Sequence, residues 1–306
     1  MYDIFENEIA NIVRPEQIKK NEPLAAHTTF RIGGPADFLI IPKKTEEIGQ
    51  ILSLCVKEDI PYYVLGNGSN VLVADEGYRG VVLCIGSGMA DCKFVEEADK
   101  VHVTAGAGIM LSKLANEVAN QGLTGFEFAA GIPGTLGGAI TMNAGAYGGE
   151  IKDTICKAKV ITPSGELLTL SKEELELGYR TSIIQKKEYI AVEAEFAFEK
   201  GDITAIKEKI SDLNRQRREK QPLEYPSAGS TFKRPEGYFA GKLIMDAGLR
   251  GYRVGDIMVS EKHCGFVVNV GKGTAKDVRT LMDDVTRIVY EKYQVKLEPE
   301  VRMLGF

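Results

Sequence analysis

Residues 122–149 read GLTGFEFAAGIPGTLGGAITMNAGAYGG and hold nine of the chain's 33 glycines. The segment is neither polar nor repetitive, so it does not have the character of a flexible linker. Because glycine loses the most backbone entropy on folding, this density predicts unusual backbone angles or close approach to another group. A row of unobstructed N–H groups suits a phosphate, and a series of tight turns in β structure explains the glycines equally well. The segment has neither GxGxxG after a strand nor GxxxxGK(S/T), so the Rossmann and P-loop interpretations fail.

Composition and charge set the class of protein around this segment. The 306 residues predict two or three domains, and 44% hydrophobic with 26% charged residues is typical of a globular protein. A formal charge of −5 argues against nucleic-acid binding. No apolar run is long enough to span a membrane, and the first residues lack a secretory signal pattern. We therefore expect a cytoplasmic protein; the sequence does not determine its oligomeric state, for which we expect a monomer.

The five cysteines are scattered and form no CxxC pair, and the three histidines lie far apart in the sequence. This pattern is typical of reduced thiols, and it predicts neither a disulfide framework nor a metal site.

Strand patterns dominate both sides of the glycine-rich segment, and Tyr189–Glu199 alternates apolar with acidic residues, which predicts a strand with one buried face. Before the segment, a helical face from Leu111 ends at Gly122, a typical C′ glycine. Ser171 and Glu174 predict a capping box for a short helix that ends at GYRTS. The other strands predicted here are Val81–Ile85, Val101–Ala105 and Lys157–Thr162.

The N-terminal part alternates helices and strands. We predict a helix within the first twenty residues, a strand at Phe38–Ile41, and a helix capped by Thr45. Tyr62–Leu65 is a strand pattern, and the turn GNGSN follows it directly.

The C-terminal part begins with a helical pattern over Ile203–Lys220, whose end NRQRREKQP is strongly basic. Cations at a helix C-terminus suit the macrodipole, which is a structural explanation for these residues. We further predict a helix at Ala240–Ala247, a strand at Gly265–Val270, a long helix from Thr274 and a closing strand at Val295–Arg302. The predicted modules are residues 1–83, 84–200 and 201–306.

Four places combine turn-forming residues with polar side chains: Gly66–Asn70, the run from Gly131 to Gly145, Gly229-Ser230, and the C-terminal LEPEVR. A plain β turn explains the first about as well as an oxygen cradle does. An isolated loop serine such as Ser230 is usually structural, and no GxSxG or neighbouring histidine indicates a hydrolase. In LEPEVR, alternation would place Glu298, Glu300 and Arg302 on one face, either as a functional group or as an exposed ion pair.

Taken in order, these segments closely resemble the UDP-N-acetylenolpyruvoylglucosamine reductases of bacterial peptidoglycan synthesis. The resemblance covers about residues 20 to 305, and the glycine-rich segment followed by AGSTFKRP and LEPEVR is its most specific part. GNGSN is shared more widely with flavoproteins of the vanillyl-alcohol-oxidase type. The resemblance implies an α+β fold: two modules that bind FAD non-covalently in the vanillyl-alcohol-oxidase manner, followed by a C-terminal domain for the UDP-sugar. It is to the family's shorter subclass, which lacks an inserted tyrosine that caps the substrate.

The resemblance also implies an activity, the NADPH-dependent reduction of UDP-N-acetylglucosamine enolpyruvate to UDP-N-acetylmuramate through FAD. By the family match, Ser230 is the proton donor, Arg180 and Glu300 stabilise an enolate-like intermediate, and Lys220 and Arg302 contact the anionic substrate. The sequence departs from the family pattern at Arg234 and at Cys264-Gly265, so no partner is assigned there or to His263. The implied FAD contacts are Gly66, Asn67, Gly68, Ser69, Asn70, Gly131, Ile132, Pro133, Gly134, Gly137, Gly138, Asn143, Ala144 and Gly145.

Two other functions fit parts of the sequence. A flavin oxidase or dehydrogenase with a different hydroxylated substrate would share GNGSN and GIPGTLGG, with His27 as a conceivable covalent tether, but would not need AGSTFKRP and LEPEVR together. A non-catalytic nucleotide-binding protein would explain the glycines and leave Ser230, Arg180 and Glu300 without a role.

Overall fold

The computed structural model describes residues 2–306 and divides them into two compact units. Unit 1 contains residues up to Lys20, Phe38–Asn67 and Gly80–Gln216, and unit 2 contains Asn21–Asp37, Gly68–Arg79 and Arg217–Phe306. Helices and strands occur in both, which confirms the predicted α+β class. The division into three modules at residues 83 and 200 stays a prediction.

The first part of the chain forms a four-stranded sheet with strand order β1-β2-β5-β3, in which β3 and β5 are parallel. Its helix α2 begins at Thr45, but the predicted cap at this residue is wrong. Lys44 is the N-cap residue and makes no side-chain cap; instead the Glu47 carboxylate accepts the Lys43 N–H at 2.7 Å. The elements are α1 (Asp3–Ile12), β1 (Ile18–Pro23), β2 (Pro35–Ile40), α2 (Thr45–Lys57), β3 (Tyr62–Leu65) and β5 (Tyr78–Cys84).

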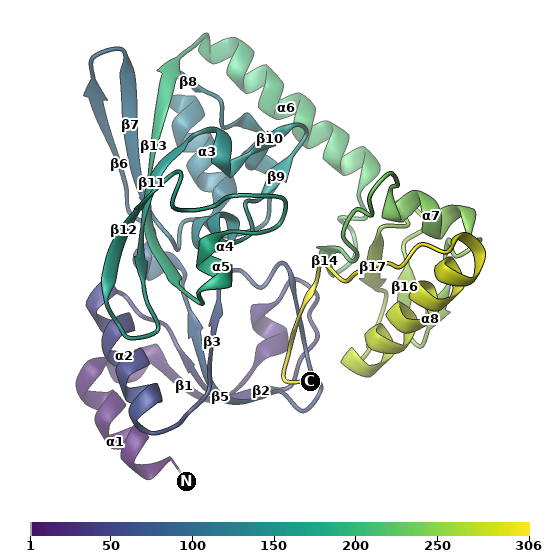
Figure 1. The fold of residues 1–306 in the computed structure, drawn as a ribbon, viewed down its shortest axis with the longest axis horizontal. Coiled ribbons are helices and arrows are strands. Elements are labelled where there is room, and N and C mark those ends of the chain that lie inside the picture. The colour runs from purple at the N-terminus through teal and green to yellow at the C-terminus, as the bar shows by residue number, and fades with distance from the viewer. Residues whose placement is uncertain (1) are drawn as a thin grey trace. The chain divides into compact units, whose positions relative to one another are not determined.

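The rest of unit 1 is built on a six-stranded antiparallel sheet, ordered β12-β11-β13-β7-β6, with the short β8 also paired to β13 (Figure 1). β13 buries Ala194, Phe196 and Phe198 and alternates them with half-buried residues, as predicted. The edge strands β6 and β12 were not predicted. The elements are β6 (Cys92–Glu97), β7 (Lys100–Gly106), α3 (Leu111–Asn120), β8 (Leu123–Thr124), α4 (Leu136–Thr141), β9 (Gly145–Ala146), β10 (Gly149–Glu150), β11 (Ile155–Ile161), β12 (Leu167–Ser171), α5 (Ile183–Lys186) and β13 (Ile190–Lys200).

The glycine-rich segment packs on this sheet through its few large side chains. The Phe126 ring lies 5.3 Å from that of Phe196 and 5.6 Å from that of Phe198, and Leu136 and Ile140 of α4 are fully buried in the same core. Gly122 ends α3 with a φ of 68°, as expected of a C′ glycine. The segment is therefore part of the core of unit 1.

The helix predicted after Ser171 is wrong, although its capping box forms. Ser171 N–H donates to Glu174 Oε2 at 2.8 Å and Glu174 N–H donates to Ser171 Oγ at 3.3 Å. Residues 172–176 nevertheless form turns, and only Leu175 among them is buried. Without an apolar face, the cap alone does not stabilise a helix.

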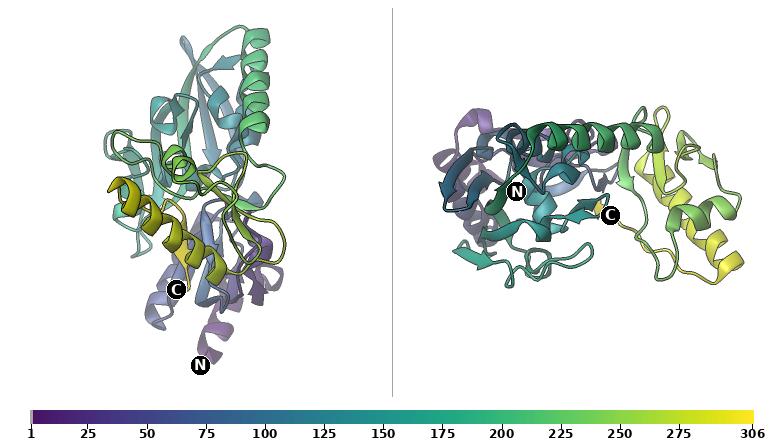
Figure 2. Two further views of the ribbon diagram at one scale, coloured as in Figure 1. Left: turned by 90° about the vertical axis from the view of Figure 1, so that its right-hand side faces the viewer. Right: turned by 90° about the horizontal axis from the view of Figure 1, so that it is seen from above.

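Unit 2 contains an antiparallel sheet ordered β14-β17-β16-β15, and α7 and α8 pack with it around one apolar core (Figure 1 and Figure 2). A parallel pair, β4 with β18, joins residues 71–73 to 302–304. α6 starts in unit 1, and its residues from Arg217 onward belong to unit 2. The elements are β4 (Val71–Val73), α6 (Ile203–Lys220), β14 (Ser227–Ser230), α7 (Ala240–Asp246), β15 (Arg253–Val254), β16 (Ile257–Val259), β17 (Phe266–Asn269), α8 (Ala275–Tyr293) and β18 (Arg302–Leu304).

The predicted strand Val295–Arg302 is wrong for all but its last residue, because β18 begins at Arg302. Pro299 interrupts the expected pairing, since proline has no N–H to donate, and it makes only an isolated bridge to Phe232. Glu298 and Glu300 therefore do not line one face of a strand. Short 3₁₀ helices complete the fold at Pro15–Gln17, Leu24–His27, Ser87–Met89, Glu127–Gly131 and Ile151–Asp153.

Among residues 2–306, no helix combines the length and the apolar character that crossing a membrane requires.

Candidate active site

The loop after β3 packs against the glycine-rich segment within unit 1. A Cβ added at Gly66 would lie 2.3 Å from Thr135 Oγ1, so a larger residue here would require the Thr135 side chain to move. The Asn67 side chain donates to the Pro133 carbonyl at 2.7 Å. The structure thus brings Gly66 and Asn67 beside Gly131–Gly138, as expected of two segments that serve one ligand.

The second half of that loop belongs to unit 2. Gly68 has a φ of 59°, and its carbonyl accepts the Thr29 N–H at 3.2 Å. The Asn70 side chain donates from Nδ2 to the Glu300 carbonyl at 3.2 Å. The backbone carbonyl of Asn70 accepts the Arg302 N–H at 3.0 Å. Asn70 therefore fixes the backbone that carries Glu300 and Arg302.

Each of these loops carries backbone donors that suit an anionic group such as a phosphate. Among the described residues, the N–H groups of Asn67, Gly134 and Thr135 in unit 1 donate to no acceptor in the protein, and the same holds for those of Gly68, Ser69 and Asn70 in unit 2. Consecutive N–H groups on a turn suit phosphate oxygens. The glycine-rich loops are therefore chemically suited to the cofactor that the sequence predicts.

The glycines themselves serve mainly the protein's own packing. A Cβ at Gly137 would meet the Ala107 Cβ at 3.0 Å, and one at Gly145 would lie 2.7 Å from the Gly149 carbonyl oxygen. Gly138, by contrast, is exposed and has only ordinary contacts. The predicted close approach is thus confirmed, but at the crowded positions the approaching group belongs to the protein.

Asn143 differs from the other predicted cofactor residues because its side chain is used within unit 1. It is 1% exposed, and its Nδ2 donates to Glu150 Oε2 at 2.8 Å and to the Gly178 carbonyl at 3.0 Å. Its Oδ1 accepts the Lys152 N–H at 3.0 Å. This amide connects the end of the glycine-rich segment to the turn before Arg180; its neighbours Ala144 and Gly145 continue into β9.

Arg180 lies in unit 1, in a tight turn whose ends pair through Gly178 N–H to Thr181 O at 3.1 Å and Thr181 N–H to Gly178 O at 3.4 Å. Its backbone has a φ of 54°, in the left-handed region. Its guanidinium lies 5.5 Å from the centre of the Tyr179 ring. An arginine in this conformation is strained, and such strain is concentrated at functional sites.

Ser230 and Glu300 come together in unit 2 although they are far apart in the sequence. Ser230 ends β14 opposite Phe266, and the next residue, Thr231, accepts the Glu300 N–H at 2.9 Å. Thr231 is 3% exposed and is fixed further by its N–H to Gly265 O at 2.9 Å and by Val267 N–H to its Oγ1 at 3.0 Å. A rigid backbone therefore presents both predicted catalytic residues.

The predicted substrate residues lie at element ends in unit 2. Lys220 is the last residue of α6 and Arg302 the first of β18, and both are exposed. Lys262, which the sequence did not single out, donates to the Arg218 carbonyl at 2.6 Å and so satisfies the end of α6.

His263, for which the sequence suggested no partner, is held locally. Burial, the larger effect, lowers its pKa, although a backbone hydrogen bond opposes this. Its Nδ1 accepts the Gly265 N–H at 3.1 Å, and its ring meets Phe266 edge-on at 5.1 Å. Its ring therefore supports the turn before β17.

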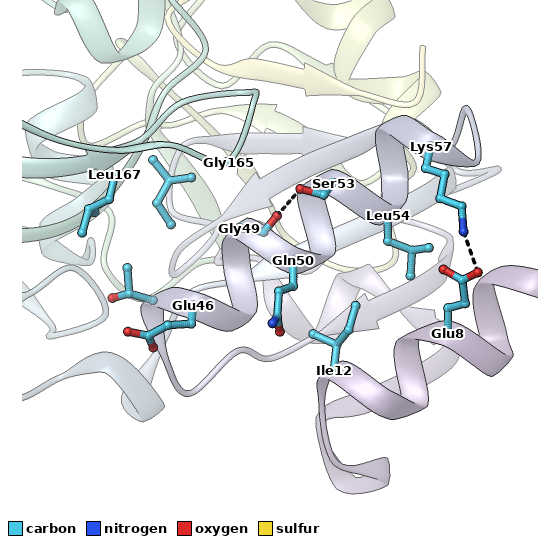
Figure 3. Close-up of a pocket in the computed structure, with 12 residues that line it drawn as sticks. Glu8, Ile12, Glu46, Gly49, Gln50, Ser53, Leu54, Lys57, Gly165 and Leu167 are labelled. Carbon is cyan, nitrogen blue, oxygen red and sulfur yellow. Dashed lines mark hydrogen bonds and ion pairs between the residues drawn. The ribbon is translucent and has the colours of Figure 1, made fainter.

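A cavity of about 590 Å³ lies elsewhere in unit 1, against α1, α2 and the β11–β12 turn (Figure 3). Its walls include Ile12 and Leu54, and Lys57 Nζ and Glu8 Oε1 pair at 2.6 Å across it. None of the residues predicted for catalysis or for FAD lines this cavity.

Comparison with known families supports the predicted chemistry. An "FAD binding domain" model matches residues 36–171, and the model "UDP-N-acetylenolpyruvoylglucosamine reductase, C-terminal domain" matches residues 221–304. The UDP-N-acetylenolpyruvoylglucosamine reductase of Lachnoclostridium phytofermentans is 58% identical over 306 residues, which is 100% of this chain and 98% of the relative. That of Clostridium novyi is 52% identical over 97% of this chain and 95% of the relative.

A solved structure agrees with the sequence comparisons. The UDP-N-acetylenolpyruvylglucosamine reductase of Thermus caldophilus is 35% identical and superposes with a TM-score of 0.78 over 93% of this chain and 98% of its own. Matches of this identity over nearly the whole length place the chain in the UDP-N-acetylenolpyruvoylglucosamine reductase family of FAD-dependent oxidoreductases.

Proposed function

We propose that this protein reduces UDP-N-acetylglucosamine enolpyruvate to UDP-N-acetylmuramate, with FAD as cofactor and NADPH as hydride donor, in peptidoglycan synthesis. The observation that carries the proposal is the full-length similarity to UDP-N-acetylenolpyruvoylglucosamine reductases, with 58% sequence identity to that of Lachnoclostridium phytofermentans. A cytoplasmic location and a monomeric state are parts of the same proposal.

FAD, when bound, accepts hydride from NADPH and passes it to the terminal methylene carbon of the enolpyruvyl group. We propose that the free N–H groups of Asn67–Asn70 and of Gly134 hold its phosphates. The remaining contacts assigned to Gly131–Gly138 and to Ala144 and Gly145 belong to the same proposal. Asn143 contributes indirectly, because its side chain is already occupied within the protein.

Hydride addition at the methylene carbon leaves negative charge on the neighbouring carbon and on the carboxylate conjugated with it. Arg180 supplies a fixed cation for this charge. Glu300 supports it only if its carboxyl group donates a hydrogen bond, since two carboxylates at one place repel each other. Lys220 and Arg302 supply further positive charge to the anionic substrate.

Ser230 completes the reaction by giving its hydroxyl proton to the carbanionic carbon, and solvent then restores the hydroxyl. A serine is a weak acid at neutral pH, so this step depends on a strongly basic acceptor and on exact placement. The hydrogen bond between Glu300 N–H and Thr231 O supports such placement, because it fixes the backbone next to Ser230.

The test is anaerobic stopped-flow absorbance at the flavin band, with NADPH added first and the enolpyruvyl substrate second. Loss of flavin colour with NADPH and rapid recovery with the substrate are expected. Loss of colour without recovery would overturn the substrate assignment and favour a flavin oxidase or dehydrogenase. A purified protein without extractable FAD would overturn the flavoenzyme assignment itself.

A further inference from the structure

The turn that carries Arg180 is held in a conformation that its own sequence does not favour. Arg180 is the second central residue of the turn Gly178–Thr181, with a φ of 54°. Glycine or asparagine is the usual residue at a turn position with positive φ. A strained residue keeps its conformation only where the surrounding structure imposes it. The positive φ of Arg180 therefore depends on the contacts that hold the turn.

Two side-chain hydrogen bonds join the turn to the glycine-rich segment, one at each end of the turn. Asn143 Nδ2 donates to the Gly178 carbonyl at 3.0 Å, just before the turn's centre. Ser182, which is fully buried, donates from Oγ to the Thr141 carbonyl at 2.8 Å just after it. The turn is thus fastened to the C-terminal end of α4.

Asn143 also holds the acidic residue whose charge acts on Arg180. Its Nδ2 donates to Glu150 Oε2 at 2.8 Å, and Lys152 Nζ lies 2.8 Å from the same oxygen. The hydrogen bond from Lys152 is the largest cause that lowers the pKa of Glu150, and the Arg180 charge is among the others. Asn143 and Lys152 therefore hold the Glu150 carboxylate, on whose pKa the Arg180 charge acts.

Asn143 is itself buried and has a φ of 43°, and both ends of its amide are occupied. A buried asparagine with three directed hydrogen bonds fixes geometry more tightly than an apolar side chain can. We infer that Asn143 is a positioning residue for Arg180: it fixes the Gly178–Thr181 turn and holds Glu150 so that the guanidinium is set for catalysis. The inference rests on the role proposed for Arg180.

The first test is the pair of half-reactions in Asn143→Ala. Flavin reoxidation by the enolpyruvyl substrate should slow about tenfold to a hundredfold, because a misplacement of about 1 Å has an effect of this size. Flavin reduction by NADPH, measured per bound FAD, should stay near wild type, because Arg180 is proposed to act only in the second half-reaction. In an Arg180→Ala background, Asn143→Ala should cause no further loss, since its effect passes through Arg180.

The second test needs no activity, because the turn contains a trypsin site at Arg180. Under native conditions, Asn143→Ala should increase cleavage after Arg180 several-fold, with the fragments identified by mass spectrometry. Asn269→Ala is the matched control: Asn269 is also buried, at 6% exposure, and accepts from Gly271 N–H and Gly273 N–H at 3.1 Å each in unit 2. It should change neither cleavage after Arg180 nor reoxidation.

Glu150→Gln keeps the test decisive if Asn143→Ala does not fold, since Glu150 is only half-buried and the change preserves its size. It should slow reoxidation several-fold without changing FAD content. Normal reoxidation and cleavage in Asn143→Ala, an effect that adds to that of Arg180→Ala, or an equal slowing of both half-reactions per bound FAD would each overturn the positioning role. Normal reoxidation in Arg180→Ala alone would instead overturn the proposed function of Arg180.

Discussion

Ser230 follows Gly229, whose φ of 75° lies in the left-handed region, and it is the last residue of β14. The β14–β17 register is irregular between Ser227 and Ser230, directly before the residue that we propose as proton donor. A role in proton donation makes the residue necessary in one half of the catalytic cycle only.

Ser230→Ala should therefore leave flavin reduction by NADPH nearly unchanged and slow reoxidation by the enolpyruvyl substrate by a factor of about 10² to 10⁴, the range of general acid catalysis. Single-turnover stopped-flow measures the two steps separately. Ser227→Ala is the control, because Ser227 lies at the other end of the same strand. An equal loss in both half-reactions would show that Ser230 is structural.

Glu127 is a buried carboxylate whose hydrogen bonds should contribute to the free energy of unfolding. It is 4% exposed and accepts from Thr124 Oγ1 at 2.8 Å and from Gly125 N–H at 3.1 Å. Burial is the largest effect and would raise its pKa, but the hydrogen bonds together with Lys209 outweigh it, so the pKa is lowered. Lys209 is itself exposed, so we assign most of the stabilisation to the hydrogen bonds.

Because the folded-state pKa is lowered, this stabilisation is present above the unfolded-state pKa and is lost as the pH falls through the folded one. Glu127→Gln should lower the free energy of unfolding by about 1–2 kcal/mol at neutral pH. The difference from wild type should shrink below about pH 4.5, the range in which a free glutamate titrates. Urea unfolding at several pH values measures this, and the exposed Glu166→Gln should show no such trend. A constant difference at all pH values would contradict the assignment.

At the scale of elements, the N-terminus of α8 is capped both by neighbouring residues and by a residue about 200 positions earlier in the chain. Thr274 and Asp277 form a capping box at the start of this helix. The Asp277 N–H donates to Thr274 Oγ1 at 3.1 Å, and the Thr274 N–H donates to Asp277 Oδ2 at 3.0 Å. In addition, the Asp75 carboxylate accepts the Ala275 and Lys276 N–H groups at 2.8 Å and 3.0 Å. A carboxylate there satisfies two free donors and suits the positive end of the helix.

Asp75→Ala should lower the free energy of unfolding by about 1–2 kcal/mol, the range for loss of an N-terminal cap. Asp75→Asn should recover part of the lost stability, since its amide oxygen can still accept a hydrogen bond from one of the two N–H groups. The control is Asp99→Ala in the exposed turn between β6 and β7. Denaturation curves that coincide for Asp75→Ala and wild type would contradict the role of Asp75.

The sequence predicts elements best where periodicity and burial agree. The alternation in β13 and the helical face of α3 follow from apolar residues that the core buries, and both were predicted. β6 was missed because most of its side chains are exposed, so no alternation marks it. The strand expected at Val295–Arg302 fails at Pro299, and the helix expected after Ser171 has a cap but no apolar face.

The same limit applies to the candidate site. Motif order predicted Ser230, Arg180 and Glu300, and the backbone bond between Thr231 and Glu300 agrees with the pairing of two of them. Glu150 and Ser182 were missed, and so were the internal hydrogen bonds of Asn143, for which a cofactor contact stays a prediction. Their partners, such as the carbonyls of Gly178 and Thr141, are determined by tertiary folding and leave no local pattern.

At the scale of the whole molecule, unit 2 depends on three separate parts of the chain. Residues 21–37 and 68–79 join 217–306 to complete it. They supply Phe30, Ile32 and Leu72 to its core and β4 as the partner of β18. The C-terminal family model, matching 221–304, covers only one of these parts.

A fragment of residues 217–306 should therefore fail to unfold cooperatively, although it contains the catalytic Ser230 and Glu300 of the proposed mechanism. It lacks the Asp75 cap of α8 and leaves the edge of β18 unpaired. Thermal unfolding followed by circular dichroism should show a broad, non-cooperative change, against a sharp transition in the intact chain. A sharp transition in the fragment would contradict this dependence.

The pairing of β4 with β18 also has a consequence for how the protein is made. Residues 71–73 leave the ribosome long before their partners at 302–304, which are translated only after the rest of unit 2. The apolar Val71, Leu72 and Val73, all buried in the folded protein, have no strand partner until then. An apolar strand with an open edge promotes association between unfinished chains. The nascent protein should accordingly depend on chaperones until residues 302–304 have emerged and paired with β4.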